Sequence, residues 1–184
     1  LENKFVVGHV GRLHPQKNHD FLIDVFAEIK KKQPDAELIL VGTGPLEEKV
    51  RSKVADKGLT ESVQFLGNRK DMNRIYQAMD IFVFPSLFEG LGIVAIEAQA
   101  AGVPIVCSEG LPPETDITPI YRKLMLSDGA EKWAEAAIEM AQSSKAHTNM
   151  QKYIIDAGFD MNATAKNMEE YYLEKEAQIR EKNK

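Results

Sequence analysis

The sequence is poor in cysteine, with Cys107 as the single one among 184 residues. One cysteine cannot form a disulfide within the chain, and it cannot build a zinc site that needs several thiolates. Cys107 follows the strand-like segment 103–106, so we expect a buried core thiol in a reducing compartment. The cysteine usage therefore favours a cytoplasmic protein.

The sequence also lacks a long hydrophobic run and an excess of positive charge. No apolar stretch approaches the roughly 20 residues of a membrane span, and no signal peptide is recognisable. The 23 basic and 28 acidic side chains give a net charge of −5, which argues against a general binder of nucleic acids or membrane surfaces. The chain begins with Leu1 and enters a strand-like segment almost at once, so we expect it to be a piece of a longer protein.

Motifs of several enzyme classes are missing as well. There is no Asp-x-Asp pair to hold a divalent ion, and no two histidines have metal-ligand spacing. Ser86 does not lie in a Gly-x-Ser-x-Gly elbow, and Gly42-Thr43-Gly44 lacks the third glycine of a dinucleotide fingerprint. We therefore expect no metal, no cofactor and no serine hydrolase.

What the sequence does contain is a regular alternation of strand-like and helix-like segments. The strand-like segments are 5–10, 36–41, 63–66, 81–84, 103–106 and 123–126. Helix-like segments cover about 21–29, 46–54, 75–79, 92–101, 130–142, 148–156 and 163–181. Strands that alternate with helices through short loops predict an α/β fold, a Rossmann-like, doubly wound parallel sheet flanked by helices. In such sheets ligands bind beyond the carboxyl ends of the strands.

The last predicted helix differs from the others. Ala165, Met168, Tyr172 and Ile179 form a narrow apolar stripe among many charged residues. A stripe of this kind needs a surface to lie against. We therefore divide the chain into a ligand-binding domain at 1–162 and a C-terminal helix at 163–184, which packs either on a domain missing from this chain or on the domain at 1–162.

A motif with two glutamates follows the strand-like segment 81–84. Glu89 and Glu97 are eight residues apart, and Gly90 and Gly92 lie between them. Glycines let the backbone approach a ligand closely, and the start of the helix at about Gly92 concentrates unpaired N–H groups and positive dipole. Eight residues of helix rise roughly 12 Å, so we expect Glu89 beside the turn and Glu97 further along the helix. The motif predicts an anion site, most simply a phosphate site.

A second loop, at the end of the first strand, carries positive charge. Gly11 and Arg12 follow that strand, and Lys17 comes just before the next helix. Arg12 can offer a planar fork of donors, and Lys17 a mobile point charge. His14 lies inside this loop and is a further candidate for contact with a ligand. Cations and helix N–H groups would neutralise a diphosphate. The two carboxylates on either side of it would accept hydrogen bonds from hydroxyl groups. A nucleotide-sugar needs both kinds of group.

Together these residues resemble the retaining nucleotide-sugar glycosyltransferases called glycosyl transferases group 1. Members of this family have the GT-B architecture, two Rossmann-like domains that face each other across a cleft. The matching segments are Gly11-Arg12 with Lys17-Asn18, Val41–Pro45, Phe65–Gly67, Ala78–Asp80 and Pro85–Pro104. They occur in the family's order, and they correspond to the C-terminal, donor-binding half of such an enzyme.

The resemblance implies a role for each matching residue. Arg12 and Lys17 would contact the donor diphosphate and stabilise the leaving nucleotide, and Glu89 would accept bonds from the transferred sugar. Glu97 would hold the ribose, and Arg69 would lie beside the nucleobase, largely through backbone atoms. The remaining donor-binding residues implied by the resemblance are Gly11, Gly90, Leu91, Gly92, Ile93 and Val94. Gly42 and Gly44 would either shape the pocket wall or serve as turn glycines.

The resemblance also implies an activity and its partners. The donor would be a nucleotide-sugar, most simply a UDP-sugar, and the acceptor a glycan or a lipid-linked glycan bound by the missing N-terminal domain. The loop 108–118 resembles the exopolysaccharide and capsule branch of the family, which implies work at the inner membrane face, and this loop would be mobile or would border the donor sugar. Two alternatives stay open: an epimerase or phosphorylase with the same fold, and a nucleotide-sugar-binding module without catalysis.

Overall fold

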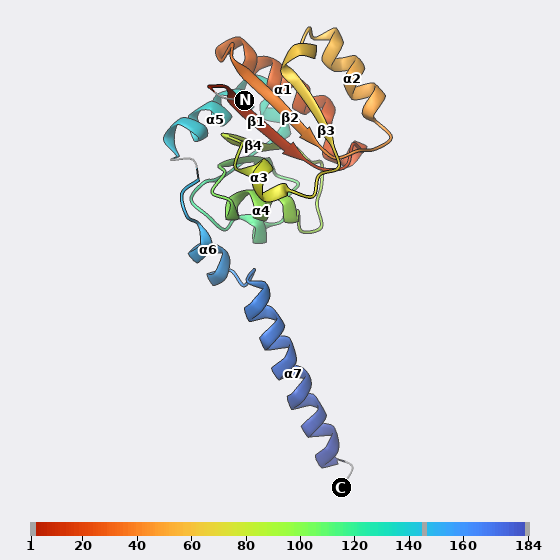
Figure 1. Cartoon of the computed structure of the whole chain (residues 1–184), viewed down its shortest axis with the longest axis vertical. Helices are drawn as coiled ribbons and strands as arrows, with labels where there is room; N and C mark the ends of the chain where they lie inside the picture. Colours follow the sequence, from red (N-terminus) through yellow and green to blue (C-terminus); the bar gives the residue numbers. More distant parts are fainter. Residues whose placement is uncertain (1–2, 145–146, 183–184) are drawn as a thin grey trace. The chain divides into compact units, whose positions relative to one another are not determined.

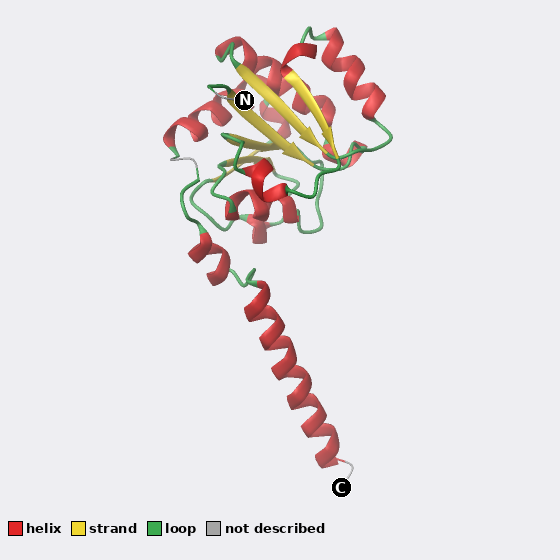
Figure 2. Ribbon diagram, viewed as in Figure 1, coloured by secondary structure: helices red, strands yellow, loops and turns green. Residues whose placement is uncertain are grey.

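The computed structural model describes residues 3–144 and 147–182 as an α/β protein built on one parallel sheet (Figures 1 and 2). The six strands are ordered β3-β2-β1-β4-β5-β6, and every neighbouring pair is parallel. The strands are β1 (Phe5–Val10), β2 (Ala36–Val41), β3 (Val63–Gly67), β4 (Ile81–Phe84), β5 (Ile105–Ser108) and β6 (Tyr121–Leu124). The predicted fold class, a doubly wound parallel sheet, is confirmed.

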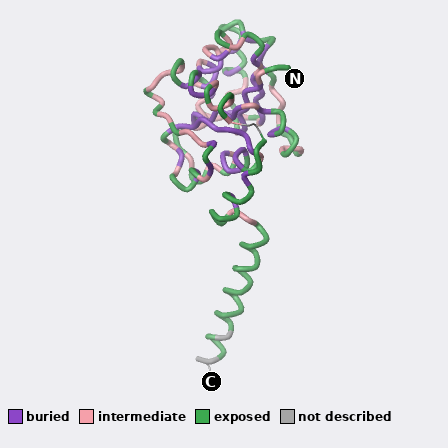
Figure 3. The backbone as a smooth tube through the Cα atoms, turned by 90° about the vertical axis from the view of Figure 1, so that its left-hand side faces the viewer, coloured by how far each residue is buried: buried purple, intermediate pink, exposed green. Residues whose placement is uncertain are grey.

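Helices cover both faces of this sheet. One apolar cluster joins Val7, Ile81 and Val83 of the strands to α1 (His19–Lys32), α2 (Glu47–Asp56) and α5 (Ala130–Ser143). The other cluster joins Val6 and Phe82 to α3 (Met72–Tyr76) and α4 (Ile93–Ala100). Adjacent residues of one strand thus enter different clusters, because side chains alternate across a strand. Burial on both faces explains the continuous apolar runs of the central strands (Figure 3).

Four short 3-10 helices lie in the connections of the described part of the chain, at Pro15–Lys17, Thr60–Ser62, Pro113–Thr115 and Leu126–Asp128.

Two predicted strand positions are corrected. The fifth strand begins at Ile105 and not at residue 103, since Pro104 has no N–H for the ladder and its carbonyl instead accepts from Phe82 N at 2.8 Å. The last strand lies two residues earlier than 123–126, where Tyr121 pairs with Ile105 and Leu124 with Ser108.

The chain divides into two compact units: the first ends at Met150, and the second begins at Gln151. The second unit contains α6 (Gln151–Asp156) and α7 (Met161–Lys182). Every α7 side chain that the structure describes is exposed, including those of the predicted stripe. The surface on which this helix packs, and the domain boundary after residue 162, stay predictions. None of the described helices combines the length and the apolar character needed to cross a membrane.

Candidate functional site

The candidate site lies where the order of the strands along the sheet reverses, between β1 and β4. Strands β1 and β4 are neighbours, but β1 leads into α1 on one face and β4 leads into α4 on the other. Between the carboxyl ends of two such strands the connecting loops separate and leave a crevice, the usual ligand position in open α/β sheets. The two loops here are residues 11–18 after β1 and residues 85–92 after β4. These are the two loops that sequence analysis selected.

The two loops are joined by backbone and side-chain bonds of Gln16. Its carbonyl oxygen accepts from Leu87 N at 2.8 Å. Its side-chain Nε2 donates to the carbonyl oxygen of Phe88, also at 2.8 Å. Gln16 is not among the residues predicted from the sequence, since a glutamine next to a lysine in a loop carries no recognisable signal. These bonds fix the spacing between the loop that carries Lys17 and the loop that carries Glu89.

Lys17 and Glu89 form an ion pair across the crevice. Lys17 Nζ lies 2.6 Å from Glu89 Oε1, and the two side chains are only 16% and 7% exposed. Lys17 Nζ also lies 4.7 Å from the centre of the Phe84 ring, a cation–π distance. The backbone of Glu89 is anchored in turn, because its N–H donates to Gly110 O at 3.0 Å. Two residues that lie 72 positions apart in the sequence are thus brought together, as the predicted site requires.

Arg12 lies in the same loop as Lys17 but has a different environment. It is exposed, and no hydrogen bond or ion pair involves its guanidinium among the residues that the structure describes. A free guanidinium can still offer its planar fork of donors to an oxyanion. The site therefore contains one cation that is already paired and one that is unpaired.

Glycines allow close backbone approaches around the crevice. Gly92 has a φ of 70° and is the N-cap of α4. The N–H groups of Ile93 and Val94, which follow it, have no partner within the helix. A Cβ at Gly42 would collide with the carbonyl oxygen of Gly11, and one at Gly44 with that of Leu13. Gly42 and Gly44 thus do more than form a turn. They allow the chain after β2 to pack closely on the loop after β1.

Glu97 lies in the second turn of α4 and is exposed. Because α4 begins only at Ile93, the segment between the glutamates is a turn followed by helix, and the expected 12 Å helical rise does not apply. Tyr76 donates its hydroxyl to Glu97 Oε2 at 2.8 Å. Both residues line an open groove of about 400 Å³ between α3 and α4. Glu97 is a site residue predicted from the sequence, whereas its partner Tyr76 is not.

Arg69, the predicted neighbour of the nucleobase, lies in the exposed loop after β3. Its guanidinium binds Asp71 with two bonds of 2.9 and 2.8 Å, and these bonds lower the pKa of Asp71 to about 2. The arginine side chain is thus already occupied. This suits a role through backbone atoms, since the loop is held by an internal pair.

The loop 108–118 is anchored to α4 through Gln99. The amide nitrogen of this fully buried side chain donates to Thr115 O at 2.8 Å, and its oxygen accepts from Thr118 N and Oγ1 at 3.2 and 2.8 Å. The same loop supplies Gly110 O to Glu89 N. The loop therefore borders the Lys17–Glu89 pair and is tied down at several points.

Two buried histidines lie beneath the site. His9 is in β1 and His19 begins α1, with ring centres 4.7 Å apart. Burial, followed by the nearby positive charge of Lys17, lowers the pKa of His19 to about 4. Burial and His19 together lower the pKa of His9 well below its ordinary value. Both rings are thus neutral near pH 7, and they add no positive charge to that of Arg12 and Lys17. His14 has a buried Nδ1 without a hydrogen-bond partner among the described residues.

No group of three or more histidine, cysteine or acidic side chains is arranged as a metal site within residues 3–144 and 147–182. Cys107 is fully buried in the core, as expected.

Two curated relatives and one solved structure illustrate the similarity to known proteins. EpsF of Bacillus subtilis, whose name assigns it provisionally to the glycosyltransferases, is 33% identical over 144 residues, which are 78% of this chain and 38% of that protein. The GDP-mannose-dependent monoacylated alpha-(1-6)-phosphatidylinositol monomannoside mannosyltransferase of Corynebacterium glutamicum is 36% identical over 73% of this chain and 37% of its own length. The crystal structure of Anabaena HepE with UDP and glucose superposes with a TM-score of 0.78 and 25% identity, over 94% of this chain and 49% of that one.

The chain thus spans less than half the length of the proteins it matches. The model of one family, glycosyl transferases group 1, matches residues 1–157. The structural neighbours have the GT-B fold, in agreement with the sheet order found here. The chain belongs to the glycosyl transferases group 1 family.

Proposed function

We propose that this chain is the donor-binding domain of a retaining glycosyltransferase that uses a UDP-sugar. The observation that carries the proposal is the Lys17–Glu89 pair, held at 2.6 Å across the crevice between β1 and β4. Arg12, in the same loop and unpaired within the described part of the chain, adds a second cation. The Anabaena structure, whose chain is covered over 49% of its length, contains UDP and glucose, which supports this donor class.

The ion pair can serve both parts of such a donor at once. An ammonium group has three protons, and Glu89 accepts one of them. The other two can bind oxygens of a diphosphate. Glu89 in turn keeps its second oxygen for hydroxyls of the sugar. The pair thus places the phosphate ligand directly beside the sugar ligand, where the bond between sugar and phosphate is to be broken.

The chemistry follows from where charge develops. Breaking the bond between the sugar and the nucleoside diphosphate leaves negative charge on the β-phosphate. Lys17, Arg12 and the N-terminal N–H groups of α4 are positive groups placed to stabilise that charge, and a preorganised site of this kind lowers the barrier. We propose that these groups replace a divalent metal, and that transfer retains the anomeric configuration, as the family resemblance implies.

The acceptor and the setting are further parts of the proposal. The acceptor is a glycan or a lipid-linked glycan, bound by residues outside this chain, in the synthesis of a surface polysaccharide. A relative of this chain carries the name of a phosphatidylinositol monomannoside mannosyltransferase, which supports an acceptor that contains lipid. The full-length enzyme would then act in the cytoplasm, in peripheral contact with the inner membrane face.

The test is calorimetric titration of this chain with UDP, GDP, ADP, their monophosphates and UDP-glucose, in the presence of EDTA. We expect UDP to bind more tightly than UMP, and chelation to leave this preference unchanged. Binding of none of the diphosphates would contradict a preformed donor site. A preference that disappears with EDTA would contradict the metal-independent arrangement. Transfer from the UDP-sugar to an acceptor by the full-length enzyme would then exclude a module that binds without catalysis.

A further inference from the structure

The short helix α3 is tied to α4 by side-chain bonds of Tyr76 and Gln77. The Tyr76 hydroxyl lies 3.4 Å from Val94 O and makes its shorter bond to Glu97. Tyr76, the last residue of α3, donates its hydroxyl to Glu97 Oε2 at 2.8 Å. Gln77, the next residue, donates its amide to Ala101 O at 3.2 Å. These bonds connect the same two helices, but only the Tyr76–Glu97 bond ends on a side chain of the candidate site.

The hydroxyl of Tyr76 is held in a fixed position. The residue is only 3% exposed, and its ring packs edge-on against Phe82 with ring centres 6.2 Å apart. Burial raises the pKa of Tyr76, and the neighbouring Glu97 carboxylate raises it further. The phenol therefore keeps its proton at any physiological pH, and in its contact with the Glu97 carboxylate it is the donor.

Glu97, in contrast, is an exposed side chain beside an open groove of about 400 Å³. A free glutamate on a helix surface samples several rotamers, and ordering it costs entropy when a ligand binds. The bond to Tyr76 engages Oε2 and selects one rotamer. Oε1 has no hydrogen-bond partner within the described residues, so it is the oxygen that can accept from a ligand.

We propose that Tyr76 is a positioning residue for Glu97, and that it sets the preference for donors with ribose hydroxyls. With Oε2 fixed by Tyr76, Oε1 accepts from the ribose without first losing rotamer freedom. Tyr76 contacts Glu97 and does not need to touch the donor. This inference rests on the proposed function, because it requires a nucleotide donor with its ribose at Glu97.

The test compares UDP with 2′,3′-dideoxy-UDP, which lacks both ribose hydroxyls, by calorimetry on this chain. We expect the wild-type chain to bind UDP roughly tenfold or more tighter than the analogue, since a hydrogen bond to a charged group is lost. The Tyr76→Phe variant keeps the ring and removes the hydroxyl. We expect it to bind UDP about three- to tenfold more weakly and the dideoxy analogue nearly as the wild type does. The ratio of the two affinities falls.

Three further variants extend the test, and the last of them is a matched control. Glu97→Gln should lower the same ratio, and combining it with Tyr76→Phe should add little, because both changes act through one carboxylate. Tyr121→Phe removes another half-buried hydroxyl, which contacts Thr115 Oγ1 at 2.9 Å, and should leave the ratio unchanged. Thermal melting of each variant separates loss of folding from loss of selectivity.

The remaining outcomes overturn the inference in distinguishable ways. If Tyr76→Phe weakens UDP and the analogue equally, Tyr76 only supports the fold and the positioning role is wrong. If the wild-type chain binds both ligands equally, Glu97 does not hold the ribose, while the diphosphate site stands. If the wild-type chain binds neither ligand, the proposed function itself fails.

Discussion

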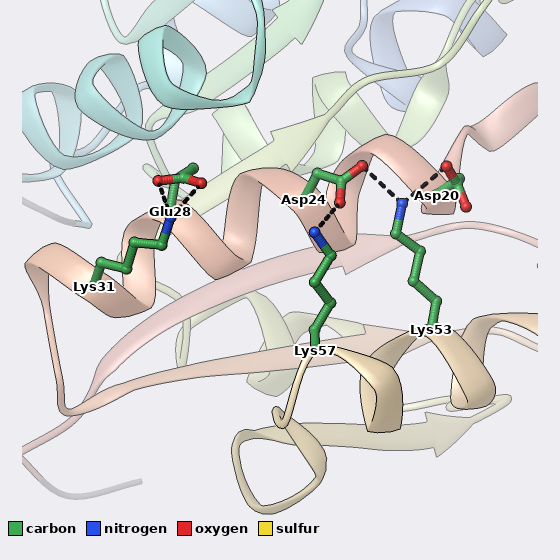
Figure 4. Close-up of polar contacts among 6 residues, drawn as sticks. All are labelled: Asp20, Asp24, Glu28, Lys31, Lys53 and Lys57. Carbon is green, nitrogen blue, oxygen red and sulfur yellow. Dashed lines mark hydrogen bonds and ion pairs between the residues drawn. The ribbon is translucent and has the colours of Figure 1, made fainter.

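Two regions of the molecule use lysine–carboxylate pairs, in different surroundings. Between α1 and α2, Lys53 lies 2.9 Å from Asp20 and 2.7 Å from Asp24, and Lys57 lies 2.9 Å from Asp24 (Figure 4). At the crevice Lys17 lies 2.6 Å from Glu89. Asp20 is 60% exposed, whereas Glu89 is 7% exposed. Water screens charges at exposed pairs but much less at enclosed ones.

The comparison shows that pairing alone does not identify a functional charge. Burial lowers the pKa of Lys53, but its bonds to the two aspartates outweigh this and raise it. These charges neutralise each other between the surfaces of α1 and α2. The Lys17–Glu89 pair instead joins two glycine-containing loops at the reversal of the sheet order. The position in the fold distinguishes the two.

The largest expected effect concerns the groups beneath the crevice. The pKa of His19 falls from 6.5 to about 4 on folding, so the unfolded chain binds a proton that the folded chain does not bind in this pH window. The contribution of His19 to the free energy of unfolding is therefore complete above pH 6.5. It is lost as the pH falls toward 4, which lowers the free energy of unfolding by about 3 kcal/mol. His9 acts in the same direction. Urea unfolding between pH 4 and 7 measures the slope.

The His19→Leu variant should reduce this slope. His147→Asn is the matched control, because His147 is exposed and its positive φ of 62° suits asparagine; this variant should keep the slope. An equal slope in wild type and His19→Leu would show that His19 is not the group that titrates.

The next largest effect is expected from breaking the pair at the crevice. Lys17→Ala removes a charged donor to the diphosphate and should weaken UDP binding by about 1.5–3 kcal/mol. Arg12→Ala should act in the same direction. Lys53→Ala removes a lysine with similar partners outside the crevice, and its affinity for UDP should equal that of wild type. Calorimetric titration of the three variants measures this. Unchanged affinity in both Lys17→Ala and Arg12→Ala would contradict the proposal that these two cations bind the diphosphate.

A smaller and more selective effect is expected from the carboxylate of the pair. Glu89→Gln keeps the shape of the side chain but weakens its bonds to sugar hydroxyls. We expect it to spare UDP binding and to reduce the preference for UDP-glucose over other UDP-sugars, by about 1 kcal/mol for a neutralised hydrogen bond. Competition between UDP-sugars in calorimetry tests this. If the variant loses UDP binding while it still melts cooperatively, the role assigned to Glu89 is wrong.

Sequence patterns were sufficient to predict the sheet and to select most residues of the candidate site, for physical reasons. Strands buried on both faces need continuous apolar runs, and residues such as Phe82 and Val83 display them. Glu89 and Lys17 carry chemistry that a short motif reveals. Gln16, Tyr76 and Gln99 were missed. Each of them makes a side-chain hydrogen bond to a residue at least 16 positions away in the sequence, and such contacts depend on the folded geometry.

The smallest expected effect is on the helix surface and sharpens the comparison from the other side. Lys53→Ala removes two ion pairs, but Asp20 is 60% exposed and is solvated by water, while Asp24 keeps its bond to Lys57 at 2.9 Å. The free energy of unfolding should therefore fall by about 0.2–1 kcal/mol at low salt. Because salt screens such charges over about 10 Å at 0.1 M, raising the ionic strength should shrink the difference from wild type. Urea unfolding at low and high salt measures it. A loss of several kcal/mol that persists at high salt would mean that the α1–α2 cluster is as enclosed as the Lys17–Glu89 pair, and the distinction between the two regions would fail.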